Sequence, residues 1–193
     1  MMRLTACLAF MLSSASVAAN AARPLSPTEE ALRLLKVDPE DAHTVSAIWN
    51  GQQTVFVDHP SARDAYGGTD RQIYAVRRSN GRLIAIKVAK VEQDGGDPEV
   101  AAIGFANADG DEAKELIVIV EWPQSHYDYG GRFLEVRLFD DAKPGQSALA
   151  PMSKLSKHFG LGCECSYRDQ RKPQHYKFST IASVQRELRR LGY

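Results

Sequence analysis

Two Asn-Gly dipeptides, Asn50-Gly51 and Asn80-Gly81, constrain the fold of this 193-residue chain more than any other feature. Between two apolar runs, Asn-Gly is the strongest short-range indication of a β-hairpin, because both residues readily adopt the left-handed conformation that a type I′ turn requires. Apolar or alternating runs flank the two dipeptides, at 45–49, 54–57, 73–77 and 83–91. The N-terminal half of the chain therefore predicts two antiparallel hairpins.

The C-terminal half predicts further strands and a helix. The strands are expected at 100–105, 115–122 and 133–139. Residues 116–120 are apolar without a break, so both faces of that strand should be covered and the strand should be central in its sheet. A helix is expected at about 180–191. Its apolar stripe comprises Ile181, Val184, Leu188 and Leu191.

A shorter helix should begin at Ser26, which can form a capping box with Glu29. Ala31, Leu34 and Leu35 would form its buried stripe. The predicted fold is mainly β with short flanking helices (α+β). It is an antiparallel sheet or sandwich of about 6–8 strands with a C-terminal helix.

Residues 1–21 are typical of a secretory signal peptide. Arg3 precedes a short apolar run, small residues follow, and cleavage is expected after Ala19 or Ala21. The run is too short for a permanent membrane anchor, so we expect a periplasmic or secreted domain over 22–193. The 24 basic and 24 acidic residues include no basic run interleaved with aromatics, so no nucleic-acid partner is expected.

Oxygen-bearing side chains recur at odd positions of the segment that links the strand predicted at 100–105 to the one predicted at 115–122. Asn107, Asp109, Asp111 and Glu115 occupy relative positions 1, 3, 5 and 9. Odd positions of a tightly turning loop converge, and Ca²⁺ takes six to eight oxygen ligands at about 2.3–2.6 Å. The spacing therefore indicates a cation-binding loop. The alternative is a β-hairpin whose acidic loop is merely solvated.

This loop resembles those of the FG-GAP and VCBS repeat families, known from integrin-type β-propellers. The resemblance implies calcium as the cofactor, with the carbonyl of Ala113 as a further ligand. Two positions differ from the family pattern: Asn107 replaces an Asp, and Glu112 replaces a Gly at a sharp turn, where a Cβ tolerates positive φ poorly. One copy of the motif cannot build a propeller, which needs at least four blades. In architecture the chain is more similar to lysozyme-inhibitor-type proteins of bacterial envelopes.

An aromatic segment follows the central strand. Trp122, His126, Tyr127 and Tyr129 have the composition of a partner-binding surface, because Tyr and Trp give large contact area with a polar group. The alternative is that these rings fold back onto the sheet. His126 and Asp128 could also form an acid–base pair, although the sequence shows no nucleophile at a recognisable spacing.

The mature chain retains two cysteines, Cys163 and Cys165, because Cys7 lies in the signal peptide. In an oxidising compartment they are expected to pair with each other or with a partner. Local pairing would need a bent backbone, because residues two apart in a strand are about 6.6 Å apart, near the limit for a disulfide.

The sequence leaves two functional classes open. The first is a non-enzymatic module that carries calcium and binds a protein or an envelope component, as an inhibitor or immunity factor does. The second is a small secreted hydrolase that uses the His126/Asp128 turn or the cation loop. We favour the first, because coordination would occupy the polar side chains of the loop.

Overall fold

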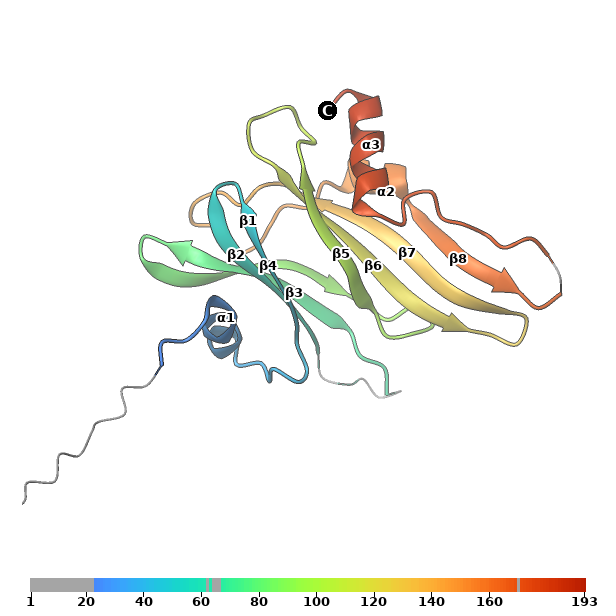
Figure 1. The fold of residues 1–193 in the computed structure, drawn as a ribbon, viewed down its shortest axis with the longest axis horizontal. Coiled ribbons are helices and arrows are strands. Elements are labelled where there is room, and N and C mark those ends of the chain that lie inside the picture. The colour runs from blue at the N-terminus through green and yellow to red at the C-terminus, as the bar shows by residue number, and fades with distance from the viewer. Residues whose placement is uncertain (1–22, 62, 64–66, 170) are drawn as a thin grey trace, which may run out of the picture.

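The computed structural model describes residues 23–61, 63, 67–169 and 171–193, and the predicted signal peptide lies outside them. Eight strands and three short helices make up the fold (Figure 1). In chain order these are α1 (Pro27–Leu35), β1 (His43–Trp49), β2 (Gln52–Pro60), β3 (Arg71–Ser79), β4 (Arg82–Val91), β5 (Glu99–Ala106), β6 (Glu115–Ser125), β7 (Tyr129–Phe139), α2 (Ser153–Phe159), β8 (Leu161–Tyr167) and α3 (Ile181–Leu191). Within the described residues, no helix has the length and apolar character needed to cross a membrane.

The strands form two four-stranded antiparallel sheets, each in simple sequence order. Sheet A has the order β1-β2-β3-β4 and sheet B the order β5-β6-β7-β8. The predicted mainly-β class, with 6–8 strands and a C-terminal helix, is therefore confirmed. Both Asn-Gly dipeptides lie at hairpin turns: φ is 47° at Asn50 and 74° at Gly51, and 50° at Asn80 and 75° at Gly81. Positive φ at both central residues is the requirement of a type I′ turn.

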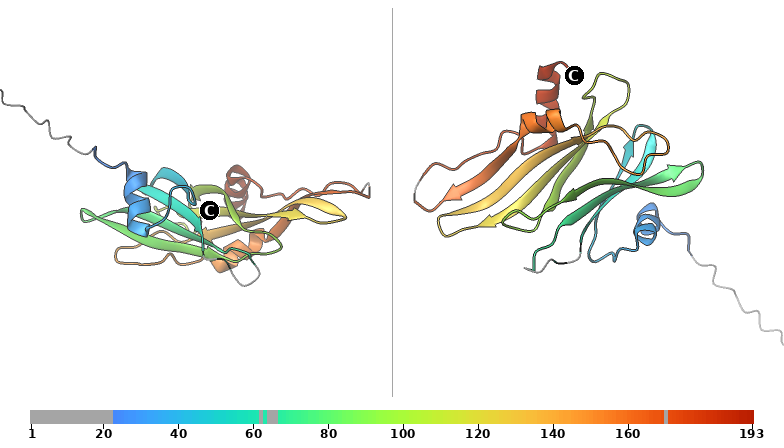
Figure 2. Two further views of the ribbon diagram at one scale, coloured as in Figure 1. Left: turned by 90° about the horizontal axis from the view of Figure 1, so that it is seen from below. Right: turned by 180° about the vertical axis from the view of Figure 1, so that it is seen from behind.

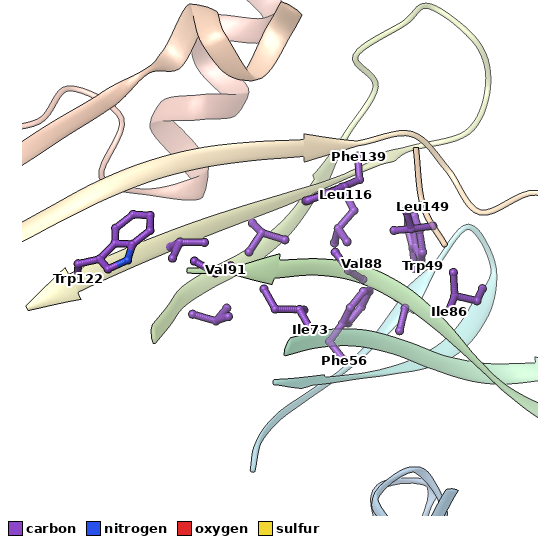
Figure 3. Close-up of a cluster of buried hydrophobic side chains, with 14 residues drawn as sticks. Trp49, Phe56, Ile73, Ile86, Val88, Val91, Leu116, Trp122, Phe139 and Leu149 are labelled. Atoms are coloured by element: carbon purple, nitrogen blue, oxygen red, sulfur yellow. The ribbon is translucent and has the colours of Figure 1, made fainter. Parts of the chain in front are cut away.

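One core fills the space between the two sheets (Figure 3). Trp49, Phe56 and Ile86 of sheet A meet Leu116 and Val118 of sheet B, and all five are nearly inaccessible to solvent. The sheets therefore pack face to face, as in a sandwich.

The helices cover the outer faces of the sheets (Figure 2). Ala31 and Leu32 of α1 pack on the outer face of sheet A. Val184 and Leu188 of α3 pack with Ile117 on the outer face of sheet B. Strand β6 is consequently buried on both faces, as its unbroken apolar run predicts.

Two local predictions differ from the structure. The stripe of α1 uses Leu32, whereas Leu34 is 42% exposed, and Leu191 at the end of α3 is 37% exposed. Helix α2 and strand β8 were not predicted: α2 has seven residues and no side-chain cap, and β8 alternates only through Leu161, two cysteines and Tyr167.

Residues 140–151, which we call the strap, connect β7 to α2 along the free edge of β4. The backbone N–H of Lys87 donates to Ser147 (2.9 Å), and that of Leu149 donates to Lys87 (2.9 Å). The strap thus joins the end of sheet B to the edge of sheet A.

Candidate metal centre

The loop between β5 and β6, residues 107–114, is fixed against the first hairpin of sheet A. The indole N–H of Trp49 donates to the carbonyl of Lys114 (2.6 Å). The side chain of Asn50 bonds both backbone groups of Lys114, accepting from its N–H (2.9 Å) and donating to its carbonyl (3.1 Å). The residue that forms the hairpin turn therefore also holds the end of the loop.

Within the loop, each polar side chain at an odd position accepts from a backbone N–H further along. Asn107 accepts from Gly110 (2.8 Å), Asp109 from Asp111 (3.1 Å), and Asp111 from Ala113 (2.7 Å). Such bonds tighten a loop by replacing backbone hydrogen bonds. Positive φ falls on Gly110 (90°) and not on Glu112, so the strain expected at Glu112 is absent.

Three carboxylates meet where the loop enters β6. Asp109, Glu115 and Asp140 each place a carboxylate oxygen within 4.8 Å of the other two. Register explains the approach of Asp140: Leu116 of β6 pairs with Phe139 of β7, so Glu115 and Asp140 are the next residues beyond that pair. We call these three residues the carboxylate cluster.

Glu115 is the buried member of the cluster. Its side chain is inaccessible to solvent, and its Oε2 accepts the N–H of Ala108. Its Oε1 has no hydrogen-bond partner among the residues that the structure describes. Burial, reinforced by the charges of Asp109 and Asp111, raises the pKa of Glu115 to about 7, against the lowering effect of the Ala108 N–H. A buried, half-satisfied carboxylate is costly unless a cation or proton accompanies it.

One ammonium group lies beside the cluster. Lys143 Nζ is 3.2 Å from Asp140 Oδ2, and hydrogen bonding to Asp140 raises the pKa of Lys143. Lys143 contacts Asp140 and, among the described residues, does not bond the buried Oε1 of Glu115. The cluster therefore keeps an excess of negative charge and oxygen donors.

The structure brings together part of the predicted ligand set. Asp109 and Glu115 belong to the cluster, whereas Asp111 does not. Ligation by Asn107 and by the Ala113 carbonyl remains a prediction. Sequence reasoning missed Asp140, although its place directly after an alternating strand, opposite the start of β6, is the feature that could have revealed it.

The residues of the predicted partner surface do not all lie at the surface. Tyr127 is 79% exposed, and the ring of His126 lies 4.4 Å from that of Tyr127 and 5.2 Å from that of Tyr129, measured between centroids. Trp122, however, is 3% exposed, and its indole N–H donates to the carbonyl of Glu92 (2.9 Å). Its prediction as a contact residue is wrong in this structure, because the ring closes one end of the core (Figure 3).

His126 and Asp128 do form a pair on this turn. The Nδ1 of His126 contacts Oδ1 of Asp128, and this hydrogen bond lowers the pKa of Asp128. Within the part of the chain that the structure describes, the His126 ring forms its hydrogen bond with Asp128, and none with a Ser, Thr or Cys side chain. The pair thus has an orienting group without a nucleophile.

The two cysteines lie on one face of β8, with their sulfur atoms in contact and their Cα atoms 5.3 Å apart. That separation is within the range of disulfides, so the structure is compatible with local pairing.

Comparison of this chain with family models, with curated proteins and with solved structures finds no match.

Proposed function

We propose that this chain is a non-enzymatic, extracytoplasmic binding domain that holds a calcium ion at the carboxylate cluster. The observation that carries the proposal is the position of Glu115. Its buried Oε1 has no hydrogen-bond partner among the described residues, and its carboxylate lies beside those of Asp109 and Asp140. A bound cation would satisfy that oxygen and would neutralise the negative charge that remains beside the Lys143–Asp140 ion pair. The chemistry of the donors fits, because all three are hard oxygen ligands.

Calcium is favoured over other cations by ligand type. The cluster offers carboxylate oxygens, and the adjoining loop offers an amide and backbone carbonyls, without sulfur or imidazole. Such donors suit Ca²⁺, Mg²⁺ and Mn²⁺, and the flexible coordination of Ca²⁺ suits ligands drawn from a loop and two strand ends. Asp109, Glu115 and Asp140 would hold the ion, and the ion would fix the loop and the strap to sheet B.

The partner would bind at the far end of sheet B. Strand β6 has 11 residues, so at about 3.3 Å per residue the turn after it lies about 33 Å from the loop before it (Figure 1). Exposed Tyr127, with the His126 and Tyr129 rings beside it, gives this turn the features of a protein-binding site. The cation would then stabilise the domain without contacting its partner, a protein or an envelope component.

A hydrolase is the second candidate, favoured by one observation, the contact between His126 and Asp128. An oriented imidazole can act as a general base. A screen with simple esters and peptidoglycan would reveal this activity, and Asp128→Asn should abolish it. Turnover that depends on Asp128 would replace the binding proposal.

Calcium dependence is tested by melting the mature protein in chelator and in millimolar calcium. At a hundredfold excess over Kd, calcium should stabilise the fold by about 2.7 kcal/mol. Asp140→Asn should remove this gain. Glu112→Gln is the matched control, because Glu112 is an exposed carboxylate of the loop and lies outside the cluster. Equal melting temperatures with calcium and with chelator would refute the metal centre, and a response to Mg²⁺ alone would reassign the ion.

A further inference from the structure

Lys143 stands at the start of a closed turn in the strap. The backbone N–H of Gln146 donates to the carbonyl of Lys143 (3.3 Å), and the N–H of Lys143 donates to Oε1 of Gln146 (2.9 Å). Pro144 and Gly145 lie between them, and the φ of 84° at Gly145 suits the third residue of a type II turn. The backbone of Lys143 is therefore held by two hydrogen bonds to one residue.

The strap is also anchored just before Lys143. The carbonyl of Ala142 accepts from the guanidinium of Arg77 in β3 (2.9 Å). The N–H of Asp141 donates to Oδ1 of Asp140 (2.9 Å), and Lys143 Nζ lies 3.2 Å from Oδ2 of Asp140. The position of this ammonium beside the carboxylate cluster thus follows from the fold of the strap, although 58% of the Lys143 side chain is exposed.

The charges of these residues define which ion balances them. Asp109, Glu115 and Asp140 carry three negative charges when all are ionised, and Lys143 carries one positive charge. A divalent ion brings the sum to zero, whereas a trivalent ion leaves one positive charge and a monovalent ion leaves one negative charge. Because Glu115 is inaccessible to solvent, an unbalanced charge beside it is costly.

Two further carboxylates lie near the cluster without belonging to it. Asp111 is exposed, so water screens its charge. Asp141 interacts with the positive charge of Arg77. Lys143 differs from both, because it contacts a member of the cluster directly.

We propose that Lys143 is a specificity-determining residue of the cation site, whose ammonium favours divalent over trivalent ions more strongly than the three carboxylates alone would. The inference rests on the calcium centre proposed above. Ligand type selects hard cations, and hard cations include trivalent ions as well as Ca²⁺. Lys143 adds a selection by charge, which the oxygen ligands do not provide.

Calorimetric titration of the mature protein with Ca²⁺ and with Tb³⁺ at low ionic strength tests this role. Tb³⁺ is nearly the size of Ca²⁺ and prefers the same oxygen ligands, so the two ions differ chiefly by one charge. Repulsion from an exposed ammonium a few ångströms away weakens binding by about threefold for each charge on the ion. Lys143→Gln should therefore tighten Ca²⁺ about tenfold and Tb³⁺ about 30-fold, which shifts the ratio of the two affinities about threefold towards Tb³⁺.

Three controls separate charge from structure. Lys143→Arg keeps the charge and should leave both affinities within about twofold of the parent. Lys172→Gln removes the same charge from an exposed lysine beyond β8, at the opposite end of sheet B, and should also stay within about twofold. Sr²⁺ has the charge of Ca²⁺, so Lys143→Gln should change the ratio of these two affinities by less than about 1.5-fold. Lys143→Met also removes the charge and should reproduce the shift seen with Gln.

The outcomes distinguish this inference from the calcium centre. If Lys143→Gln and Lys143→Met tighten Ca²⁺ and Tb³⁺ by the same factor, or weaken Ca²⁺, the role of Lys143 is overturned and the metal centre stands. An equal shift in Lys172→Gln would assign the effect to net charge and would also overturn the role of Lys143. Failure of both the parent and Lys143→Gln to bind Ca²⁺ would overturn the metal centre, and the inference with it.

Discussion

Replacing Glu115 by Gln should have opposite effects on the metal-free and the calcium-loaded protein. Glutamine keeps the size of the side chain and an oxygen that can accept the Ala108 N–H, but it removes the charge. In the metal-free protein the buried, charged carboxylate destabilises the fold, whereas in the calcium-loaded protein it stabilises the fold as a ligand of the ion. The same substitution therefore distinguishes a cation site from a structural hydrogen bond.

The magnitude follows from the pKa of Glu115, raised from its ordinary 4.5 to about 7 by burial. A carboxyl whose pKa is raised on folding stabilises the fold fully below the unfolded pKa, and this contribution is lost as pH rises through the folded value. At 1.36 kcal/mol for each pH unit, the metal-free protein should lose about 3 kcal/mol at this group between pH 4.5 and pH 8. Glutamine does not ionise, so the stability of the Gln variant should not fall at this position between pH 4.5 and pH 8.

We therefore expect Glu115→Gln to be more stable than the parent in chelator at pH 8, by about 1–3 kcal/mol once the buried amide N–H₂ is allowed for. For a domain of this length, that raises Tm by about 2–10 °C. In saturating calcium the parent should gain about 2.7 kcal/mol and the variant nothing. Thermal melts at pH 5 and pH 8, each with calcium or chelator, measure all four values.

Glu112→Gln is the control, because Glu112 lies in the same loop with its side chain exposed. It should change Tm by no more than about 1–2 °C in any of the four conditions. A Glu115→Gln variant that is less stable than the parent in chelator at pH 8 would refute the reasoning. It would mean that the carboxylate has a favourable partner in the metal-free fold.

Two further predictions concern the aromatic residues and the cysteines. Trp122→Ala should destabilise the fold by about 3–5 kcal/mol, as removal of a buried large side chain does, whereas Tyr127→Ala should change stability by less than about 0.5 kcal/mol and weaken partner binding by more than about 1 kcal/mol. Denaturant melts and a pull-down compare the two, and a destabilised Tyr127 variant that still binds would locate the partner elsewhere. The mature protein should show no free thiol before reduction, and Cys163→Ser should cost little stability because the closed loop is short. Mass spectrometry with and without reduction decides this, and two alkylatable cysteines in unreduced protein would contradict it.

Local chemistry made much of the fold predictable. Asn50 and Asn80 specify their turns through the conformations of two adjacent residues, and the capping box at Ser26 depends on residues three apart. The unbroken apolar run of β6 indicated a strand covered on both faces. The structure confirms this, because Leu116 and Val118 lie in the core between the sheets and Ile117 packs under α3 on the outer face. These features depend on short-range geometry, which the sequence records directly.

The features that escaped prediction depend on partners distant in the sequence. Asp140 joins the carboxylate cluster only because β6 and β7 pair in one register. The neighbours of Trp122 in the sequence suggest a surface residue, yet its indole N–H donates to the carbonyl of Glu92, 30 residues earlier. Helix α2, which has seven residues and no side-chain cap, is held by the packing of Phe159 on the outer face of sheet B.

The sequence order of the two sheets has a consequence for assembly during synthesis. Residues 43–91 contain every strand of sheet A, and residues 99–167 contain every strand of sheet B. The first sheet can therefore form from local contacts as soon as its half of the chain emerges, and local pairings of this kind form fast. Its inner face, with Phe56, Ile73 and Ile86, then stays uncovered until sheet B arrives. A chain interrupted within residues 92–98 would present this apolar face to other molecules, so the N-terminal half alone is expected to aggregate and not to persist as a folded fragment.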